Sequence, residues 1–173
     1  MANVKHWCAS RRLQLNTDKT EAIRFGSRAY INNLSSHDRT LTIDETTINT
    51  TGVVRDLGVL LDSELSMTQH VAKVASVYHV RCLRQIRRRV GQKVTTRLVL
   101  VLVMTRLDYC NSLLAVLPQS TLEPLQRVQN CAARLILNLR QGNEIMLSVK
   151  PALKQLHWLP IQAHVQFKLC SAH

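Results

Sequence analysis

Residues 53–90 read VVRDLGVLLDSELSMTQHVAKVASVYHVRCLRQIRRRV, and this stretch decides the fold because its pattern changes partway along. Val53 to Asp62 alternates around Gly58, which is typical of two short strands joined by a glycine-containing turn. After Leu65 the period lengthens to that of a helix, and Ser66 to Gln69 has the S-x-x-Q form of a capping box. The sequence therefore predicts an α+β protein that divides near Leu65.

The part before the division, residues 1–65, is predicted to be a helix followed by short strands. The helix is indicated by residues at roughly helical spacing, namely Val4, Trp7, Cys8 and Leu15. The strand patterns that follow lie at 21–25, 41–43 and 46–49. Asp44 and Glu45 separate the last two, which predicts a hairpin, and the polar residues 27–39 predict a loop.

The part after the division, residues 66–140, is predicted to be a three-helix bundle. Its first helix runs to Gly91, and its apolar face is formed by Val71, Val74, Ala75, Tyr78, Cys82 and Ile86. Residues 94–114 are apolar nearly all round, as the central helix of a bundle would be. Their core at 98–104 fits a buried strand equally well by periodicity, but the length of the segment favours a helix.

A second capping box, Ser120 to Glu123, predicts the start of the third helix. The apolar face of this helix comprises Leu122, Leu125, Ala132, Leu135 and Leu139. Arg127 and Arg134 are expected to point to its far side. The remaining segment, 141–173, is predicted to be a loop over 141–150 and a last helix from Pro160 to Phe167.

Composition favours a folded protein with a polyanionic partner. The chain has 173 residues, is 46% hydrophobic and carries 23 Lys and Arg against 11 Asp and Glu, which gives a formal charge of +12. Such a surplus favours nucleic acid over a membrane as partner, with a charge that serves general solubility as the alternative. Two Trp, three Tyr and two Phe are few for a surface that stacks on the bases of single strands.

The cysteines and the N-terminal residues predict an intracellular location. The five cysteines are an odd number without any C-x-x-C, so neither a zinc finger nor a disulfide framework is expected. Residues 1–16 lack the apolar stretch of a signal peptide. The longest apolar run, Leu98 to Met104, is too short to span a bilayer, so no membrane role is expected.

Arginines form a basic face on the first predicted helix of the bundle. Arg81, Arg84 and Arg88 fall within an arc of about 60° when plotted on a helical wheel. Between Met67 and Gln119 there are nine Lys and Arg and one acidic residue, Asp108. A face that serves solubility normally carries both signs of charge, whereas this one repels itself unless phosphates lie on it. The pattern therefore predicts nucleic-acid binding, and a merely solvated face is the competing interpretation.

A search for catalytic and metal-binding motifs finds none. The sequence has no Gly-rich phosphate loop, no G-x-S-x-G, no H-E-x-x-H and no Asp-Asp pair. His70 and His79 lie nine positions apart, which places them on different helix faces. We therefore assign no catalytic residue, no metal ligand and no cofactor to this chain.

Five ordered blocks resemble the reverse transcriptases of non-LTR (LINE-type) retrotransposons. WCASRRLQLNTDKTEAIRF, at 7–25, is similar to the stretch that follows the catalytic aspartate-bearing turn of the palm in those enzymes. VRDLGVLLDSELSMTQHV, at 54–71, is similar to the primer grip and the start of the thumb. The other blocks, which resemble segments in and after the thumb, are RLDYCNSLLAVLP at 106–118, LQRVQNCAARLI at 125–136 and LHWLPI at 156–161.

The resemblance implies a fragment derived from an RNA-directed DNA polymerase, comprising the end of the palm and the thumb. The parent enzymes hold Mg²⁺ with palm aspartates that include an Asp-Asp pair, and this sequence has no such pair. We therefore expect this chain to be inactive as a polymerase unless a partner supplies the palm and fingers. It would retain a surface that binds the backbone of an RNA/DNA hybrid or duplex with low sequence specificity.

The resemblance also implies roles for individual residues. Lys19 matches a lysine thought to approach the phosphates of the incoming nucleotide, and a surface lysine is the alternative. Leu57, Gly58 and Val59 match the primer-grip turn, and an ordinary hairpin glycine is the alternative. Arg81, Arg84 and Arg88, with Arg134 as a weaker addition, lie where the thumb tracks the template–primer duplex.

Two other interpretations of the sequence remain. The basic helices could form an interaction module that binds an acidic protein. Residues 13–21, LQLNTDKTE, are also similar to a short N-terminal region of an alkylation-repair dioxygenase homologue. Because the chain has no H-x-D, the usual start of a facial iron triad, we expect no dioxygenase chemistry from that likeness.

Overall fold

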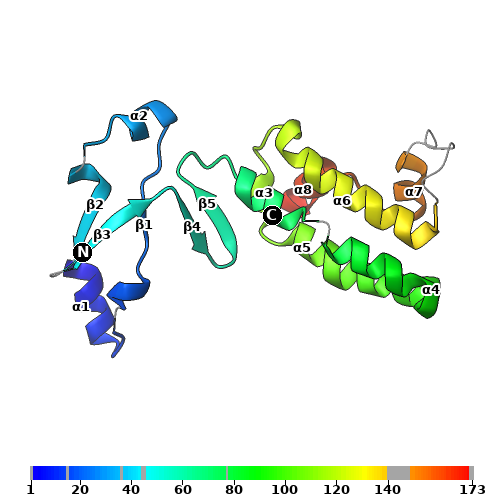
Figure 1. Ribbon diagram of the computed structural model, residues 1–173, viewed down its shortest axis with the longest axis horizontal. Helices are drawn as coiled ribbons and strands as arrows, with labels where there is room; N and C mark the ends of the chain where they lie inside the picture. Colours follow the sequence, from blue (N-terminus) through cyan, green and yellow to red (C-terminus); the bar gives the residue numbers. More distant parts are fainter. Residues whose placement is uncertain are drawn as a thin grey trace. The chain divides into compact units, whose positions relative to one another are not determined.

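The protein has an α+β fold and separates into two compact units, Met1–Ser66 and Met67–His173. The computed structural model describes residues 2–14, 16–35, 37–43, 46–76, 78–139 and 149–171. The first unit contains the strands and the second is helical (Figure 1). The boundary therefore falls beside Leu65, where the period of the sequence changes.

Two small sheets form the first unit. β3 (Thr46–Thr51) pairs antiparallel with β2 (Thr40–Ile43) and parallel with β1 (Ala22–Ile23), which gives the order β1-β3-β2. β4 (Val53–Asp56) and β5 (Val59–Asp62) form a separate antiparallel pair. Both hairpins lie where the alternating pattern predicts them, while the predicted turn at Asp44 and Glu45 lies outside the described residues.

Helical segments precede and interrupt these strands. They are α1 (Ala2–Ser10), η1 (Thr17–Lys19), α2 (Arg28–Asn32) and η2 (His37–Arg39). α1 confirms the predicted first helix, although Leu15 lies outside the described residues. The prediction of a loop over 27–39 is wrong, because Ser27 caps α2 by accepting a hydrogen bond from the Tyr30 backbone N–H at 3.3 Å.

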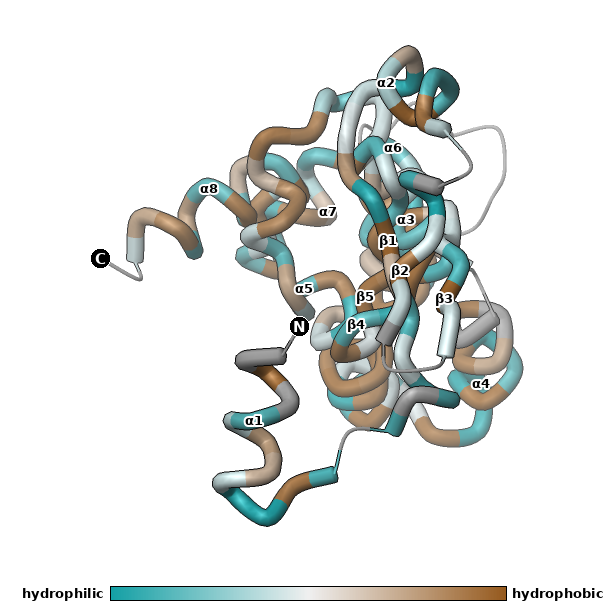
Figure 2. The backbone as a smooth tube through the Cα atoms, turned by 90° about the vertical axis from the view of Figure 1, so that its left-hand side faces the viewer, coloured by the Kyte–Doolittle hydropathy of each residue, from teal (hydrophilic) through white to brown (hydrophobic). Residues whose placement is uncertain are grey.

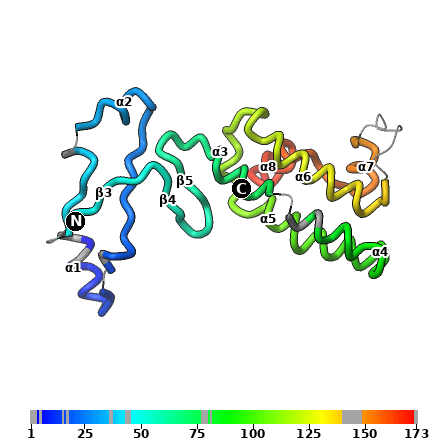
Figure 3. The backbone as a smooth tube through the Cα atoms, in the orientation of Figure 1, coloured from blue at the N-terminus to red at the C-terminus, as the bar shows by residue number. Residues whose placement is uncertain are grey.

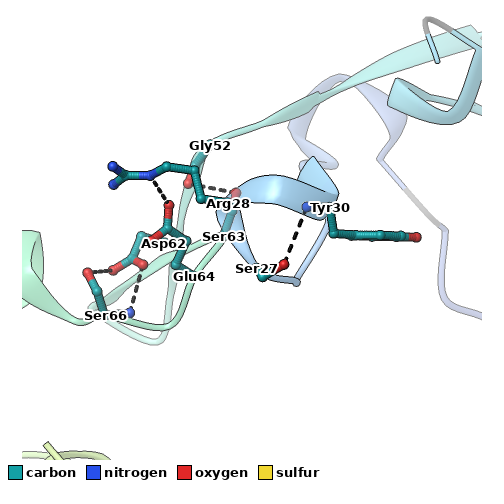
Figure 4. A network of polar contacts seen from close by, with 8 residues as sticks. All are labelled: Ser27, Arg28, Tyr30, Gly52, Asp62, Ser63, Glu64 and Ser66. Carbon is teal, nitrogen blue, oxygen red and sulfur yellow. Dashed lines mark hydrogen bonds and ion pairs between the residues drawn. The ribbon is translucent and has the colours of Figure 1, made fainter. Parts of the chain in front are cut away.

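A network of hydrogen bonds ends the first unit (Figure 4). The two carboxylate oxygens of Asp62 accept from the backbone N–H of Ser66 at 2.8 Å and from its hydroxyl at 3.1 Å. Arg28 Nε donates to Glu64 Oε1 at 2.9 Å, and both this hydrogen bond and the charge of Glu64 raise the pKa of Arg28. The predicted capping box is wrong, because the N-cap residue of the next helix is Met67 and no side chain caps it. The next helix begins at Thr68, after Met67 in a left-handed conformation.

The second unit is built from helices of unequal length. They are α3 (Thr68–Val74), α4 (Tyr78–Val99), the π-helix η3 (Leu100–Met104), α5 (Thr105–Asp108), η4 (Asn111–Leu114), α6 (Gln119–Leu137), α7 (Val149–Gln155) and α8 (Ile161–Ser171). A break after Ala75 divides the single helix that was expected from Ser66 to Val90. Figure 2 shows both hydrophobic and hydrophilic residues along α4, as an amphipathic helix requires.

Gly91 reverses the direction of the chain within α4. Its φ of 72° and ψ of 178° are not helical. Val80 and Val103 line the same small cavity, although a continuous helix would hold them about 34 Å apart. Residues 78–90 and 92–108 therefore form an antiparallel helical hairpin, which the chain trace shows (Figure 3). Gly91 ends the first helix of the bundle, as predicted.

The returning limb of this hairpin is helical but less buried than expected. Residues 98–104 are helical, which rules out the alternative of a strand. Thr95, Val99, Val103 and Leu107 face the core at four-residue intervals. Val101, in contrast, is 63% exposed, and Leu100 and Leu102 beside it are exposed as well. The expectation of a helix buried on all sides is therefore wrong, since this limb packs on one face.

α6 is the central helix of the second unit. Leu122, Leu125, Ala132 and Leu135 are buried as predicted, while Leu139 lies beyond the helix and is exposed. Pro118 precedes the helix and Ser120 lies inside it, so the second predicted capping box is also wrong. Pro118 is the N-cap residue, in an extended conformation and without a side-chain cap hydrogen bond.

The C-terminal residues pack onto α6. Gln129 is fully buried, and its Nε2 donates to the Leu159 carbonyl at 2.9 Å. Gln126 Oε1 accepts from the Ile161 backbone N–H at 2.9 Å. The described part of the predicted third segment, 149–171, therefore belongs to the helical unit, and it contains α7, which the sequence analysis did not predict.

Candidate nucleic-acid interface

The net charge of the chain resides in the helical unit. Residues 1–66 contain eight Lys and Arg and eight Asp and Glu, so their formal charge is zero. Residues 67–173 contain fifteen Lys and Arg and three Asp and Glu, which accounts for the whole charge of +12. Any electrostatic attraction of a polyanion therefore acts mainly on the helical unit.

The described acids of the helical unit are already paired. Asp108 lies 2.6 Å from His164 Nε2 through Oδ1 and 3.0 Å from Lys168 Nζ through Oδ2, which ties α5 to α8. Glu123 accepts from Arg127 Nη2 at 2.7 Å within α6. The third acid, Glu144, lies outside the described residues. The described carboxylates therefore do not neutralise the arginines of α4.

Four arginines line one cleft between α4 and α6. Arg84, Arg87 and Arg88 come from α4 and Arg134 from the last turn of α6, around a volume of about 560 Å³. Residues three and four apart lie on the same side of a helix, which brings the three α4 side chains together. Buried Leu83 and Leu135 belong to the core that holds the two helices. We refer to this feature as the arginine cleft.

Arg87 has a structural role in the arginine cleft. It is half-buried, and its Nη2 donates to the Ile136 carbonyl at 3.0 Å. This bond satisfies a carbonyl in the last turn of α6, which has no partner within the helix. The buried Nε of Arg87 has no hydrogen-bond partner among the described residues.

The other three guanidinium groups have no partner within the part of the chain that the structure describes. Among the described residues, Arg84, Arg88 and Arg134 side chains take part in no hydrogen bond or ion pair. The nearby end of α6 offers few acceptors, because the Arg134 carbonyl accepts from the Leu139 N–H at 3.0 Å and the Ile136 carbonyl accepts from Arg87. These three arginines are thus available to an anion that enters the cleft.

The lining also contains uncharged residues. They are Asn138 and the less polar Cys131, Leu135 and Leu139, and none of the described lining residues is acidic. Leu135 is buried and Cys131 is half-buried. A cleft with guanidinium groups and apolar side chains suits an anion attached to a less polar group.

The structure brings together three of the four predicted contact residues, Arg84, Arg88 and Arg134. The side chain of Arg81 lies outside what the structure describes. Arg134 does not point to the far side of α6 as expected, since it is half-buried and lines the cleft. Arg87 was missed, although its spacing of three from Arg84 was a usable signal.

The other predicted residues belong to the first unit. Lys19 is exposed at the end of η1. Leu57 and Gly58 form the tight turn between β4 and β5 with φ angles of 44° and 89°, and Leu57 is 83% exposed. Two positive φ angles are what a two-residue hairpin turn requires. Val59 is buried, which favours a packing role for that residue.

No protein-family model, curated protein or solved structure matches this chain. Within the described residues, no group of three or more His, Cys, Asp or Glu is placed to hold a metal ion. Each described helix is too short or too polar to cross a bilayer. Inferences about function therefore rest on the arginine cleft and on the sequence resemblance.

Proposed function

We propose that this chain binds the phosphate backbone of a nucleic-acid duplex through the arginine cleft and the basic surface of α4 around it. The proposal extends to descent from a non-LTR retrotransposon reverse transcriptase, in which the helical unit serves as a thumb for the template–primer duplex. Catalysis is left to a polypeptide that supplies the palm and fingers.

One observation carries this proposal. Three guanidinium groups that have no partner among the described residues line one cleft, in a unit that has a formal charge of +12. Like charges at such spacing on a helix cost a few tenths of a kcal/mol per pair, and a bound phosphate reverses the sign of that energy. Contacts of this kind position a nucleic acid without reading its sequence.

The resemblance supports a more specific duplex. A thumb that follows a template–primer would favour an RNA/DNA hybrid or another A-form duplex, whose wide minor groove displays 2′-hydroxyl groups. Asp62, one of the acids near the predicted primer grip, accepts two hydrogen bonds from Ser66 and so has a structural use in this chain. Asp44 lies outside the described residues.

The test replaces Arg84, Arg88 and Arg134 together with glutamine, which keeps a long polar side chain but removes the charge. We expect duplex binding to weaken, and the plot of log affinity against log salt to become shallower by about 2 to 3, because each lost phosphate contact removes about 0.9 from the slope. Fluorescence anisotropy with a labelled hybrid duplex, measured over a salt series, gives both quantities.

A matched control removes the same charge from the first unit through Arg11→Gln, Arg12→Gln and Arg55→Gln, all of which are exposed. The control should lose little affinity, and circular dichroism must show that both variants are folded. Binding that stays as tight and as salt-dependent in the cleft variant would contradict the proposal. Binding to a partner in cell extract that persists after nuclease treatment would also contradict the proposal, since that result favours an acidic protein.

A further inference from the structure

The shape of the arginine cleft restricts the class of possible ligands more than its charge does. A duplex is a convex rod, and arginines at the rim of a cleft can reach its internal phosphates, as the proposed function requires. The arginines of this chain also surround a recess of about 560 Å³. A recess accepts a group that projects from a strand, and the group that projects with negative charge is a terminal phosphate.

The charge of the lining fits a terminal phosphate as well. An internal phosphodiester carries one negative charge, whereas a phosphate monoester carries about −1.5 to −2 at neutral pH and has three acceptor oxygens. Arg84, Arg88 and Arg134 come from two helices and line one recess, where none of the described residues accepts a hydrogen bond from them. Guanidinium groups bind phosphate oxygens through paired N–H donors, and bonds to an ionised group are roughly twice as strong as neutral ones.

The apolar part of the lining provides for the rest of the end nucleotide. Cys131 and Leu139 offer a surface that suits a sugar or an unstacked base better than it suits a free inorganic ion. Leu139 is 49% exposed, so its side chain has area left to be covered by a ligand. Arg87 holds the end of α6 in place through the Ile136 carbonyl and so preserves the shape of the recess.

Resting on the proposed function, we propose that the arginine cleft binds the phosphate monoester at the end of a nucleic-acid strand. The ligand class is a nucleoside carrying a terminal phosphate, at either the 5′ or the 3′ end. The chain would then recognise a strand end in addition to following the duplex backbone.

The test compares otherwise identical duplexes that have a short single-stranded overhang ending in a 5′-hydroxyl, a 5′-phosphate or a 3′-phosphate. With the full chain at one fixed salt concentration, we expect a phosphate at one of the two ends to tighten binding about tenfold over the hydroxyl end. The double variant Arg88→Gln, Arg134→Gln should lose this gain. The control Arg11→Gln, Arg12→Gln should keep it.

Each outcome separates this inference from the proposed function. Equal affinity for all three ends, with tight and salt-dependent binding retained, would overturn the inference and leave duplex binding intact. Absence of binding to every duplex would overturn both. If the terminal phosphate still tightened binding to the folded double variant, the strand end would bind outside the arginine cleft. That result would also overturn the inference. Competition by inorganic phosphate as effective as that by a mononucleotide would count against a role for the apolar lining.

Discussion

At the scale of single residues, the arginines of the cleft divide into two kinds. Arg87 uses its guanidinium within the protein, where it donates to the Ile136 carbonyl. The other three guanidinium groups donate no hydrogen bond to the described residues, so their charge is available to a ligand. They belong to Arg84, Arg88 and Arg134. Substitution of Arg87 should therefore affect stability as well as binding, which is why Arg87 is left out of the proposed variants.

His70 is a residue whose burial predicts a pH dependence of stability. It is 5% exposed, and burial, followed by the positive charge of Lys73, lowers its pKa from the ordinary value of 6.5. The unfolded chain then binds this proton more readily than the folded one, so the contribution of His70 to stability is complete above about pH 6.5 and is lost as the pH falls below that value. We expect the free energy of unfolding to fall by at most about 1.4 kcal/mol per pH unit from this group.

Urea unfolding at several pH values checks this expectation. His70→Gln should flatten the dependence between pH 7 and pH 5. If the His70 variant retained the full pH dependence of the free energy of unfolding, that dependence would belong to another titrating group.

At the scale of elements, the helical hairpin of α4 depends on Gly91. A φ of 72° with a ψ of 178° is a conformation that essentially only glycine adopts, and Thr95 adds a hydrogen bond from its hydroxyl to the Gly91 carbonyl at 2.6 Å. This reversal places Arg84, Arg87 and Arg88 on a short limb beside α6, whereas an uninterrupted helix would carry residues 92–108 away from the core.

Gly91→Ala should destabilise the helical unit through backbone strain alone. A Cβ at this position would meet no atom within 4 Å, so the expected cost of about 1 to 3 kcal/mol arises from the positive φ. Gly52→Ala is the matched control, since it also meets nothing within 4 Å but has no positive φ. Thermal unfolding followed by circular dichroism should show a lower midpoint for the first variant only, and equal midpoints would mean that the reversal is not strained by alanine.

At the scale of the whole molecule, burial and charge are both concentrated in one unit. Among side chains that the structure describes, Val59 is the one buried residue of the first unit, where Trp7, Phe25 and Tyr30 are exposed. The helical unit contains the remaining buried hydrophobic residues. A unit with so little burial gains little free energy to offset the ordering of its chain.

Hydrogen exchange should therefore differ between the units. We expect amides of β2 and β3 to exchange at least about a hundredfold faster than those in the middle of α6, because the former open locally and the latter require unfolding of the core. Mass spectrometry of peptic fragments from the full chain measures both. Protection of β2 and β3 equal to that of α6 would show that the first unit is stabilised by contacts beyond its own residues.

The sequence by itself determined the fold class, the position of the division and the two hairpins. These features depend on local periodicity and on turn residues such as Gly58, which neighbours in the chain specify. It also determined that α4 ends its first limb at Gly91, and it identified three arginines that line the cleft. Both predicted capping boxes were wrong, since Met67 and Pro118 occupy the N-cap positions of α3 and α6.

The tertiary structure alone decided how these pieces make a site. Arg84 and Arg134 lie fifty positions apart, and they line one cleft only because the core packs α4 against α6. The exposure of Val101 and the burial of Gln129 likewise follow from which face each helix turns toward its neighbours. Composition made the chain cationic, but long-range packing determined which cations meet around a recess and which carboxylates are already paired, because those contacts join residues that are distant in sequence.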